Sequence, residues 1–235
     1  MKGDVIGIFE SEKIKKKYTS FFNIPGEVIH IGSCIKPIFK DQNYDLSKGI
    51  YYFGNLEYGR FDAIKQFATC LIKQMPGVQV HIFSRDLSKE MLKKKCQSNL
   101  FFHQSVPYSN VLKLIDESGA LLIAESFEEK YISLVRYSLS TKVGDSFCSM
   151  KPLICIGGVG AGAADFVKEQ HCAFVCDDPN ELDSFCEALK NDFSFRAEKM
   201  ASKQFKVAST LFNEAHEALL FKDIVRKYLK VRTDD

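Results

Sequence analysis

One stretch of the chain, Ser140-Thr141-Lys142-Val143-Gly144-Asp145, combines residue types that bind a phosphorylated ligand. Its hydroxyl residues can cap a helix, and the lysine adds a cation beside free backbone amides, which suits a diphosphate. Lys142 and Asp145 are three residues apart, so on a helix they share a face, and the carboxylate can accept hydrogen bonds from a ribose diol. An ordinary helix cap with a weak surface ion pair would use the same residues, and the spacing favours neither interpretation.

A second candidate is the segment Gly54-Asn55-Leu56-Glu57-Tyr58-Gly59-Arg60, which follows an apolar run and precedes a helical pattern. Glycines let the backbone approach a ligand closely, and Arg60 can offer a forked donor to a phosphate. A turn of this kind between a strand and a helix often contains glycine for structural reasons alone. The segment therefore supports a phosphate site only together with other evidence.

A third segment, Gly158-Val159-Gly160-Ala161-Gly162-Ala163, matches the GxGxxA pattern of dinucleotide-binding folds. Asp177 and Asp178 follow about twenty residues later, as that pattern requires. An NAD(P)-binding oxidoreductase that uses Gly158, Gly160, Ala163 and Asp178 is therefore an alternative function. Against it, such folds place the motif near the start of their sheet, and only helical patterns follow Asp178 here.

The eight cysteines do not indicate a disulfide framework or a metal site. Most lie in apolar runs, where a free thiol behaves as a small hydrophobe, and no secretion signal begins the chain. We therefore expect reduced thiols and a cytoplasmic protein. His171, Cys172 and Cys176 lack a second ligand pair, so we expect no structural zinc. No apolar run approaches the roughly 20 residues of a membrane span.

Short apolar runs alternate with longer segments of helical period, which predicts an α/β fold with a parallel Rossmann-like sheet and helices on both faces. Runs with little polar alternation suit strands that are buried on both faces. The expected strands are Ile50 to Phe53, Gln79 to Phe83, Leu100 to Phe102, Ala120 to Ala124, Leu153 to Ile156 and Ala173 to Cys176.

Three crossover helices follow from the spacing of apolar residues. The first extends from Phe61 to Met75, before Pro76 and Gly77. The second begins at Ser109 as N-cap, and the third covers Thr141 to Ser149. The second is expected to turn these residues toward the sheet: Val111, Leu112, Leu114 and Ile115.

The two ends of the chain differ from this middle part. Residues 1–40 predict a strand (Val5 to Phe9), a helix (Glu12 to Phe22) and a strand (Val28 to Ile31), followed by a polar linker from Lys40 to Lys48. Residues 41–212 form the expected Rossmann-like domain, and residues 213–235 a C-terminal helix. Apolar stripes are expected on two terminal helices, at Leu182, Phe185, Cys186 and Leu189 and at Leu219, Leu220, Ile224, Val225 and Leu229.

Composition and charge exclude several classes of protein. The 235 residues are 46% hydrophobic and 26% charged, which is typical of a globular domain and not of a disordered chain. The formal net charge is only +2, so no nucleic-acid partner is expected. The clustered lysines, at 13 and 15–17 and at 93–95, are interpreted as solvated helix faces.

The segment from Ser140 to Ile154 resembles the donor site of GT-B nucleotide-sugar glycosyltransferases. Such enzymes have a hydroxyl residue, a lysine and an acidic residue, and then a helix that ends before Lys-Pro and an apolar strand, here Lys151-Pro152. Segments 54–67 and 99–116 resemble the first strand-to-helix turn and the region near the base. The resemblance covers about residues 50–230, the donor-binding half of such an enzyme, and residues 4–38 resemble the strand, helix and strand that lead into it.

The resemblance implies a role for each matching residue. Lys142, with Ser140 and Thr141, would contact the donor phosphates, and Asp145 would bind the ribose hydroxyls. Arg60 would help to neutralise the diphosphate, and no metal or other cofactor is expected. Base recognition would fall near Val106 and Tyr108, and the first turn would contribute Gly54 and Asn55 to the donor site.

Three positions depart from the family's pattern. Asn55 stands where many retaining members have an arginine. Tyr137 stands eight residues before Asp145, where those members have a glutamate, and Met150 replaces a glycine before Lys151-Pro152. The catalytic residues and the stereochemistry therefore stay open.

The resemblance implies transfer of a sugar from a nucleoside-diphosphate sugar, such as a UDP or GDP sugar, by a hexosyltransferase-like enzyme in cell-surface polysaccharide synthesis. The acceptor would be a glycan or a lipid-linked saccharide. An acceptor-binding domain or subunit is expected to complete the enzyme, which could then act at the inner face of the membrane. A noncatalytic docking module is a further alternative.

Overall fold

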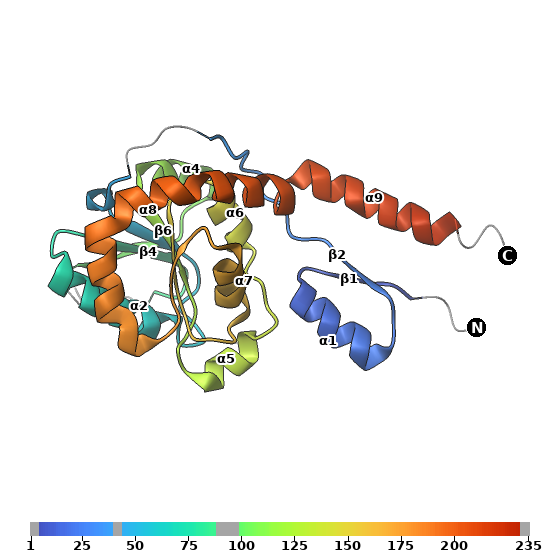
Figure 1. Ribbon diagram of the computed structural model, residues 1–235, viewed down its shortest axis with the longest axis horizontal. Helices are drawn as coiled ribbons and strands as arrows, with labels where there is room; N and C mark the ends of the chain where they lie inside the picture. Colours follow the sequence, from blue (N-terminus) through green and yellow to red (C-terminus); the bar gives the residue numbers. More distant parts are fainter. Residues whose placement is uncertain (1–4, 40–43, 88–98, 231–235) are drawn as a thin grey trace.

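The computed structural model describes residues 5–39, 44–87 and 99–230, and a six-stranded parallel sheet forms its centre (Figure 1). The strand order is β5-β4-β3-β6-β7-β8, and every neighbouring pair is parallel. The strands are β3 (Ile50–Phe53), β4 (Val80–Ser84), β5 (Leu100–Gln104), β6 (Ala120–Ala124), β7 (Leu153–Ile156) and β8 (Phe174–Cys176). The direction of winding reverses between β3 and β6, so the predicted Rossmann-like fold is confirmed.

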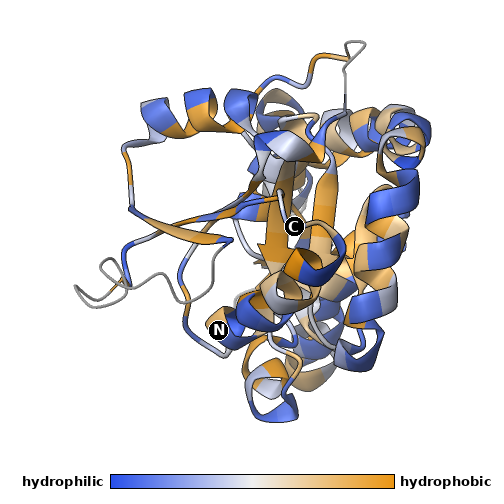
Figure 2. Ribbon diagram, turned by 90° about the vertical axis from the view of Figure 1, so that its left-hand side faces the viewer, coloured by the Kyte–Doolittle hydropathy of each residue, from blue (hydrophilic) through white to orange (hydrophobic). Residues whose placement is uncertain are grey.

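Helices cover both faces of this sheet, and each face has its own hydrophobic core. Figure 2 shows the hydrophobic strands enclosed by helices that are hydrophobic on one side and hydrophilic on the other. One core contains α2 (Arg60–Gln74) and the first half of α8 (Leu182–Leu211). The other contains α4 (Tyr108–Glu117), α5 (Glu129–Val135), α6 (Lys142–Cys148), α7 (Gly162–Gln170) and the end of α8.

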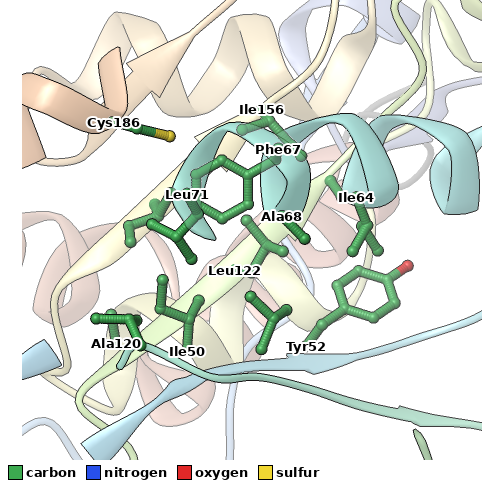
Figure 3. Close-up of a cluster of buried hydrophobic side chains, with 14 of the residues drawn as sticks. Ile50, Tyr52, Ile64, Phe67, Ala68, Leu71, Ala120, Leu122, Ile156 and Cys186 are labelled. Atoms are coloured by element: carbon green, nitrogen blue, oxygen red, sulfur yellow. The ribbon is translucent and has the colours of Figure 1, made fainter. Parts of the chain in front are cut away.

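Helix α2 fixes the position of the first strand-to-helix turn. Its residues Ile64, Phe67 and Leu71 are fully buried and point toward Ile50 and Leu122 of the sheet (Figure 3). Spacings of three and four place these side chains on one face of the helix, as the sequence predicts. The N-terminus of α2 is therefore held at the carboxyl end of β3.

The structure corrects several predicted boundaries. Helix α4 begins at Tyr108 after the N-cap Pro107, so Ser109 lies inside the helix. Leu112 is 38% exposed and does not face the sheet, because the buried side of α4 is centred on Ile115. On α9 (Glu214–Lys230), Ile224 is buried but Leu219 is 60% exposed, so this predicted stripe is only partly covered.

Other predictions concern polar segments and lysine clusters. Within the predicted linker, a short 3-10 helix (Leu46–Lys48) buries Leu46, so the described part of this segment packs on the core. Residues 40–43 and the lysines at 93–95 lie outside the described residues. Lys13 forms an ion pair with Asp165, so the first lysine cluster is not simply solvated.

Met150 occupies a backbone conformation that usually requires glycine. Its φ of +59° is left-handed, and its side chain is buried. A side chain at positive φ is unfavourable, and burial of the thioether chain offsets part of that cost. The turn expected from the family's glycine is therefore kept although the residue differs.

A small unit precedes the main sheet, formed by β1 (Gly7–Phe9), α1 (Glu12–Phe22) and β2 (Gly26–Val28). The strands pair in parallel as a two-stranded sheet. Strand β2 ends at Val28, earlier than predicted, because the chain then turns toward α8, where the Ser33 amide donates to the Phe212 carbonyl. Figure 1 shows this unit and α9 on the same side of the main sheet.

Much of the apolar surface of this unit is exposed. Helix α1 has no buried residue. The large hydrophobic residues at the surface of the N-terminal unit include Val5, Ile8, Tyr18, Phe21 and Phe22. Two strands and one helix seldom make an independently stable sheet, so contacts with other elements must support the unit. Lys227 of α9 provides one by pairing with Glu27, at 3.1 Å.

A layer of aromatic and histidine rings lies on one face of β3, β4 and β5. The rings of His81 and His103 stack with centroids 5.2 Å apart, and Nδ1 of His81 lies 3.0 Å from Nε2 of His103. Phe83 stacks on His103, and Tyr51 lies against His81. Burial, with a smaller contribution from His103, lowers the pKa of His81 to about 4, and burial also lowers the pKa of His103.

We expect this layer to make folding sensitive to mild acid. Because the folded state holds His81 neutral below its ordinary pKa of 6.5, the free energy of unfolding should fall as the pH decreases from about 6.5 toward 4. Since the rings are half-buried, the expected loss is on the order of 1–2 kcal/mol. Urea unfolding of the wild type and of His81→Phe at pH 7 and 4.5 measures it. The variant should lose less stability, whereas His216→Gln on the exposed α9 should behave as wild type.

Candidate functional site

A cavity of about 700 Å³ opens at the carboxyl ends of β3 and β6, where the winding of the sheet reverses. Ligands of open α/β sheets bind at this position, because the loops that follow both strands diverge there. Apolar side chains between the sheet and α4 form its floor, among them Val111, Ile115, Leu121 and Ile123. Eight of the nine predicted donor-site residues line the cavity: Gly54, Asn55, Arg60, Tyr108, Ser140, Thr141, Lys142 and Asp145.

The ninth predicted residue, Val106, lies in the loop between β5 and α4 but does not line the cavity. Tyr108, at the first turn of α4, does so. The two residues predicted together for base recognition are therefore separated, because the chain turns into α4 directly after Pro107.

The turn between β3 and α2 is held by side chains on both sides. Asp86 accepts a hydrogen bond from the Leu56 amide at 2.8 Å, and the Tyr52 hydroxyl donates to the Asn55 carbonyl. Gly59 has a φ of +71°, and a Cβ atom there would lie 2.5 Å from Oγ of Ser126. Glycine is therefore required at position 59 for both conformation and space.

Arg60 forms a buried ion pair with Glu125, a residue that the sequence analysis did not identify. Its Nε donates to Oε2 of Glu125 at 3.0 Å and its Nη2 to Oε1 at 3.2 Å, while Nη1 donates to Oδ1 of Asn55. The side chains are only 13% and 4% exposed. Burial raises the pKa of Glu125, and the charge of Arg60 opposes this shift. The only sequence signal for Glu125 is a charged residue directly after an apolar strand.

The segment Ser140–Lys142 leads into α6, and its side chains form no hydrogen bond with the residues that the structure describes. Thr141 is the N-cap residue, yet its side chain makes no capping hydrogen bond. Within the described part of the chain, the ammonium group of Lys142 has no hydrogen-bond or ion-pair partner, whereas its carbonyl accepts from the Ser146 hydroxyl at 2.8 Å. Partial burial of its ammonium group, together with the nearby Arg60 and Arg85, lowers the pKa of Lys142, and Glu125 opposes this shift. The helix cap and the Lys142–Asp145 ion pair of the alternative interpretation are not found among the residues that the structure describes.

Asp145 contacts residues of other elements instead. Its Oδ1 accepts a hydrogen bond from the hydroxyl of Ser33, which lies in the segment after β2. Burial and the neighbouring carboxylate of Asp145 raise the pKa of Tyr108 to about 12. Asp145 therefore connects the N-terminal segment with α4 and α6 at the cavity.

The small N-terminal unit contributes Glu10 to the cavity wall. One oxygen of its carboxylate accepts a hydrogen bond from the Leu139 amide at 3.3 Å, directly before Ser140. Nothing in the spacing of the sequence connects positions 10 and 139. The sequence analysis missed Glu10 because its place depends on how the two parts of the chain pack.

The glycine segment 158–163 serves packing, and none of its residues lines the cavity. A Cβ atom at Gly162 would lie 2.4 Å from the carbonyl oxygen of Ser138, so α7 can approach the preceding loop only with glycine there. The Gly160 amide donates to Asp165, and Asp178 accepts from the Asn180 amide. These contacts account for the motif and do not favour the NAD(P) alternative.

The described residues outside the cavity form neither a metal site nor a membrane span. No group of three or more His, Cys, Asp or Glu residues there could hold a metal ion, and no described helix is long and apolar enough to cross a membrane. All described cysteines have free thiols. Cys70 is half-buried and Cys34 exposed, whereas the remaining five are buried, mostly as the apolar runs predict.

The sheet order, the helices on both faces and the cavity at the switch point define the fold of the C-terminal half of GT-B glycosyltransferases. Pneumococcal O-GlcNAc transferase GtfA, solved with UDP and GlcNAc, matches with a TM-score of 0.71 and 14% identity, over 95% of this chain and 45% of that chain. Anabaena HepE, solved with UDP-glucose, matches with a TM-score of 0.67 and 13% identity, over 94% and 63%. S. aureus TarM, in a structure that includes UDP, matches with a TM-score of 0.64 and 14% identity, over 95% of this chain and 43% of that chain.

This chain therefore spans less than half the length of GtfA and TarM. No protein-family model matches its sequence. The search of curated proteins found no match either.

Proposed function

We propose that this chain binds the nucleoside-diphosphate sugar of a glycosyltransferase. The observation that carries the proposal is the unpaired ammonium group of Lys142, which lines the cavity beside Ser140 and Thr141. An ammonium group and free hydroxyls can bind phosphate oxygens without breaking existing contacts. Asp145 would accept hydrogen bonds from the ribose, while the base would lie toward Tyr108.

The same groups would assist sugar transfer. As the glycosidic bond breaks, negative charge accumulates on the leaving diphosphate, and a fixed cation and hydrogen-bond donors stabilise it. We propose that side chains and backbone amides perform this role without a metal. The catalytic residue stays unassigned, because the position of the acceptor is needed to identify it.

A partner for the acceptor belongs to the same proposal. The chain matches about half of GtfA, and a further domain of the protein or a separate subunit would bind the glycan or lipid-linked saccharide. The exposed apolar residues of β1, α1 and β2 would provide a surface for that part. We propose cell-surface glycan synthesis at the cytoplasmic side of the membrane as the context.

The test is calorimetric titration of UDP and GDP, and of their sugars, against the wild type and Lys142→Ala. Loss of a charged hydrogen bond to phosphate costs roughly 1.5–3 kcal/mol, so affinity should fall about tenfold or more. Lys65→Ala, on the exposed side of α2, removes the same charge away from the cavity and should bind as wild type. Equal affinity of Lys142→Ala and wild type would contradict the site.

A noncatalytic docking module is a second candidate, and one observation favours it. Arg60, the other cation of the cavity, already pairs with Glu125 and Asn55. A chain of this kind would bind donor weakly and act through its partner surface. Transferase activity that appears only with an acceptor-binding part would distinguish the incomplete enzyme from the docking module.

A further inference from the structure

We propose that Glu125 determines how much negative charge the cavity accepts in a ligand, because it neutralises Arg60 where a phosphate would otherwise bind. The inference deepens the proposed function and rests on it. Glu125 would determine ligand specificity indirectly, by changing the charge that Arg60 presents to the ligand.

The contacts of Arg60 leave no nitrogen of its guanidinium group without a protein acceptor. Nε and Nη2 donate to the two oxygens of Glu125, and Nη1 donates to Asn55. A carboxylate in this forked arrangement uses the same donor geometry as two phosphate oxygens would. A phosphate could therefore use the Nε and Nη2 pair of donors only in competition with Glu125. The remaining N–H groups of Nη1 and Nη2 would offer the phosphate a cation that Glu125 already neutralises.

The balance of charges that line the cavity also supports a neutralising role for Glu125. The described cavity residues comprise two cations, Arg60 and Lys142, and three carboxylates, Glu10, Glu125 and Asp145. Their formal balance is negative, although the proposed ligand carries a diphosphate. Because Arg60 and Glu125 cancel each other, Lys142 is left as the cation available to the ligand.

Burial makes this cancellation effective. The side chain of Glu125 is only 4% exposed, so water screens its charge weakly. Burial also raises the pKa of Glu125 against the effect of Arg60, because desolvation disfavours the charged form of the carboxyl group. Removing its negative charge should release Arg60 for an anionic ligand.

The experiment compares Glu125→Gln with wild type by calorimetric titration of UDP, UMP and uridine. The amide keeps the size of the side chain but not its charge. At about 5 Å, one unit charge changes affinity by about tenfold or more in a partly buried site. We therefore expect UDP to bind at least tenfold more tightly to the variant, UMP to gain less, and uridine to be unchanged. Glu187→Gln, on the exposed side of α8, is the matched control and should bind all three as wild type does.

The double variant Arg60→Leu/Glu125→Leu tests the same inference if the single variant does not fold. An apolar pair of similar volume can replace a buried ion pair without loss of folding. Because the pair contributes no net charge, UDP affinity should stay within about threefold of wild type. A tenfold loss would show that Arg60 contacts phosphate in the wild type and would overturn the inference.

The result also separates this inference from the proposed function. If wild type binds UDP through Lys142 but Glu125→Gln gives no gain, the role of Glu125 is wrong and the donor site stands. A gain that is equal for UDP, UMP and uridine would indicate a change of shape and would equally refute a charge effect. If neither protein binds UDP, both proposals fail.

Discussion

Truncation of Phe67 to alanine should lower the free energy of unfolding by about 3–5 kcal/mol. The ring is fully buried between α2 and the sheet, among Ile50, Leu71 and Leu122 (Figure 3). The loss combines the transfer of the ring to water with the cavity left between rigid elements. Urea unfolding monitored by circular dichroism measures it, with the midpoint and the slope fitted together.

Lys65→Ala is the control for this prediction, because position 65 lies on the exposed side of the same helix. Its effect should stay within about 0.5 kcal/mol. A loss below about 1 kcal/mol for Phe67→Ala would mean that α2 does not pack on the sheet as described. The turn that carries Arg60 would then lack its support.

Replacement of Arg60 by leucine should destabilise the protein by about 3–5 kcal/mol at pH 7.5. The substitution leaves the Glu125 carboxylate buried without its partner. Burial already raises the pKa of Glu125, and loss of Arg60 removes the largest opposing contribution. The folded variant therefore holds a proton on Glu125 more tightly than the unfolded chain does. Its stability should fall as the pH rises through the pKa of the folded state.

Urea unfolding at pH 5 and at pH 7.5 tests both parts of this prediction. The deficit of Arg60→Leu relative to wild type should be smaller at pH 5, because a raised pKa makes the carboxyl of Glu125 neutral in a larger fraction of molecules there than at pH 7.5. Arg226→Leu breaks an exposed ion pair with Asp223 and should cost no more than about 1 kcal/mol at either pH. A deficit for Arg60→Leu that does not vary with pH would show that packing and not charge explains the loss.

The two variants examine opposite sides of the same site. Phe67 packs α2 against the core. Glu125, at the carboxyl end of β6, binds Arg60, the first residue of α2. A large effect at both positions would show that the site depends on packing of α2 and on the ion pair at its start. It would not by itself assign a ligand, which is the purpose of the titrations with nucleotides.

The sequence by itself determined the main elements of the fold. Strands β3, β6 and β7 match the predicted ranges, because a strand buried on both faces needs an unbroken apolar run. The predicted helices α2 and α6 also appear, with each boundary differing by one residue. Helix α4 begins before Ser109 because the Pro107 carbonyl already accepts from the Asn110 and Val111 amides, although Pro107 makes no side-chain capping hydrogen bond.

The structure brings most of the predicted site residues to one cavity, whereas the contact between Arg60 and Glu125 was not predicted. Residues after successive strands gather at one edge of a parallel sheet, so eight predicted residues line one cavity. Their roles stay proposals. The glycine pattern at 158–163 was ambiguous in the sequence, because close packing and phosphate binding both require glycine. The approach of the Ser138 carbonyl to Gly162 in the structure shows that packing explains this pattern.

The local pattern of residues along the chain thus determined which segments form strands and helices, and which polar residues follow them. Tertiary structure decided which charges meet. Arg60 and Glu125 are 65 residues apart and pair because β3 and β6 are neighbours, and Glu10 reaches the cavity only through packing of the N-terminal unit. Apolar periodicity is a local property of the sequence, whereas an ion pair depends on the distance between two side chains in the folded molecule.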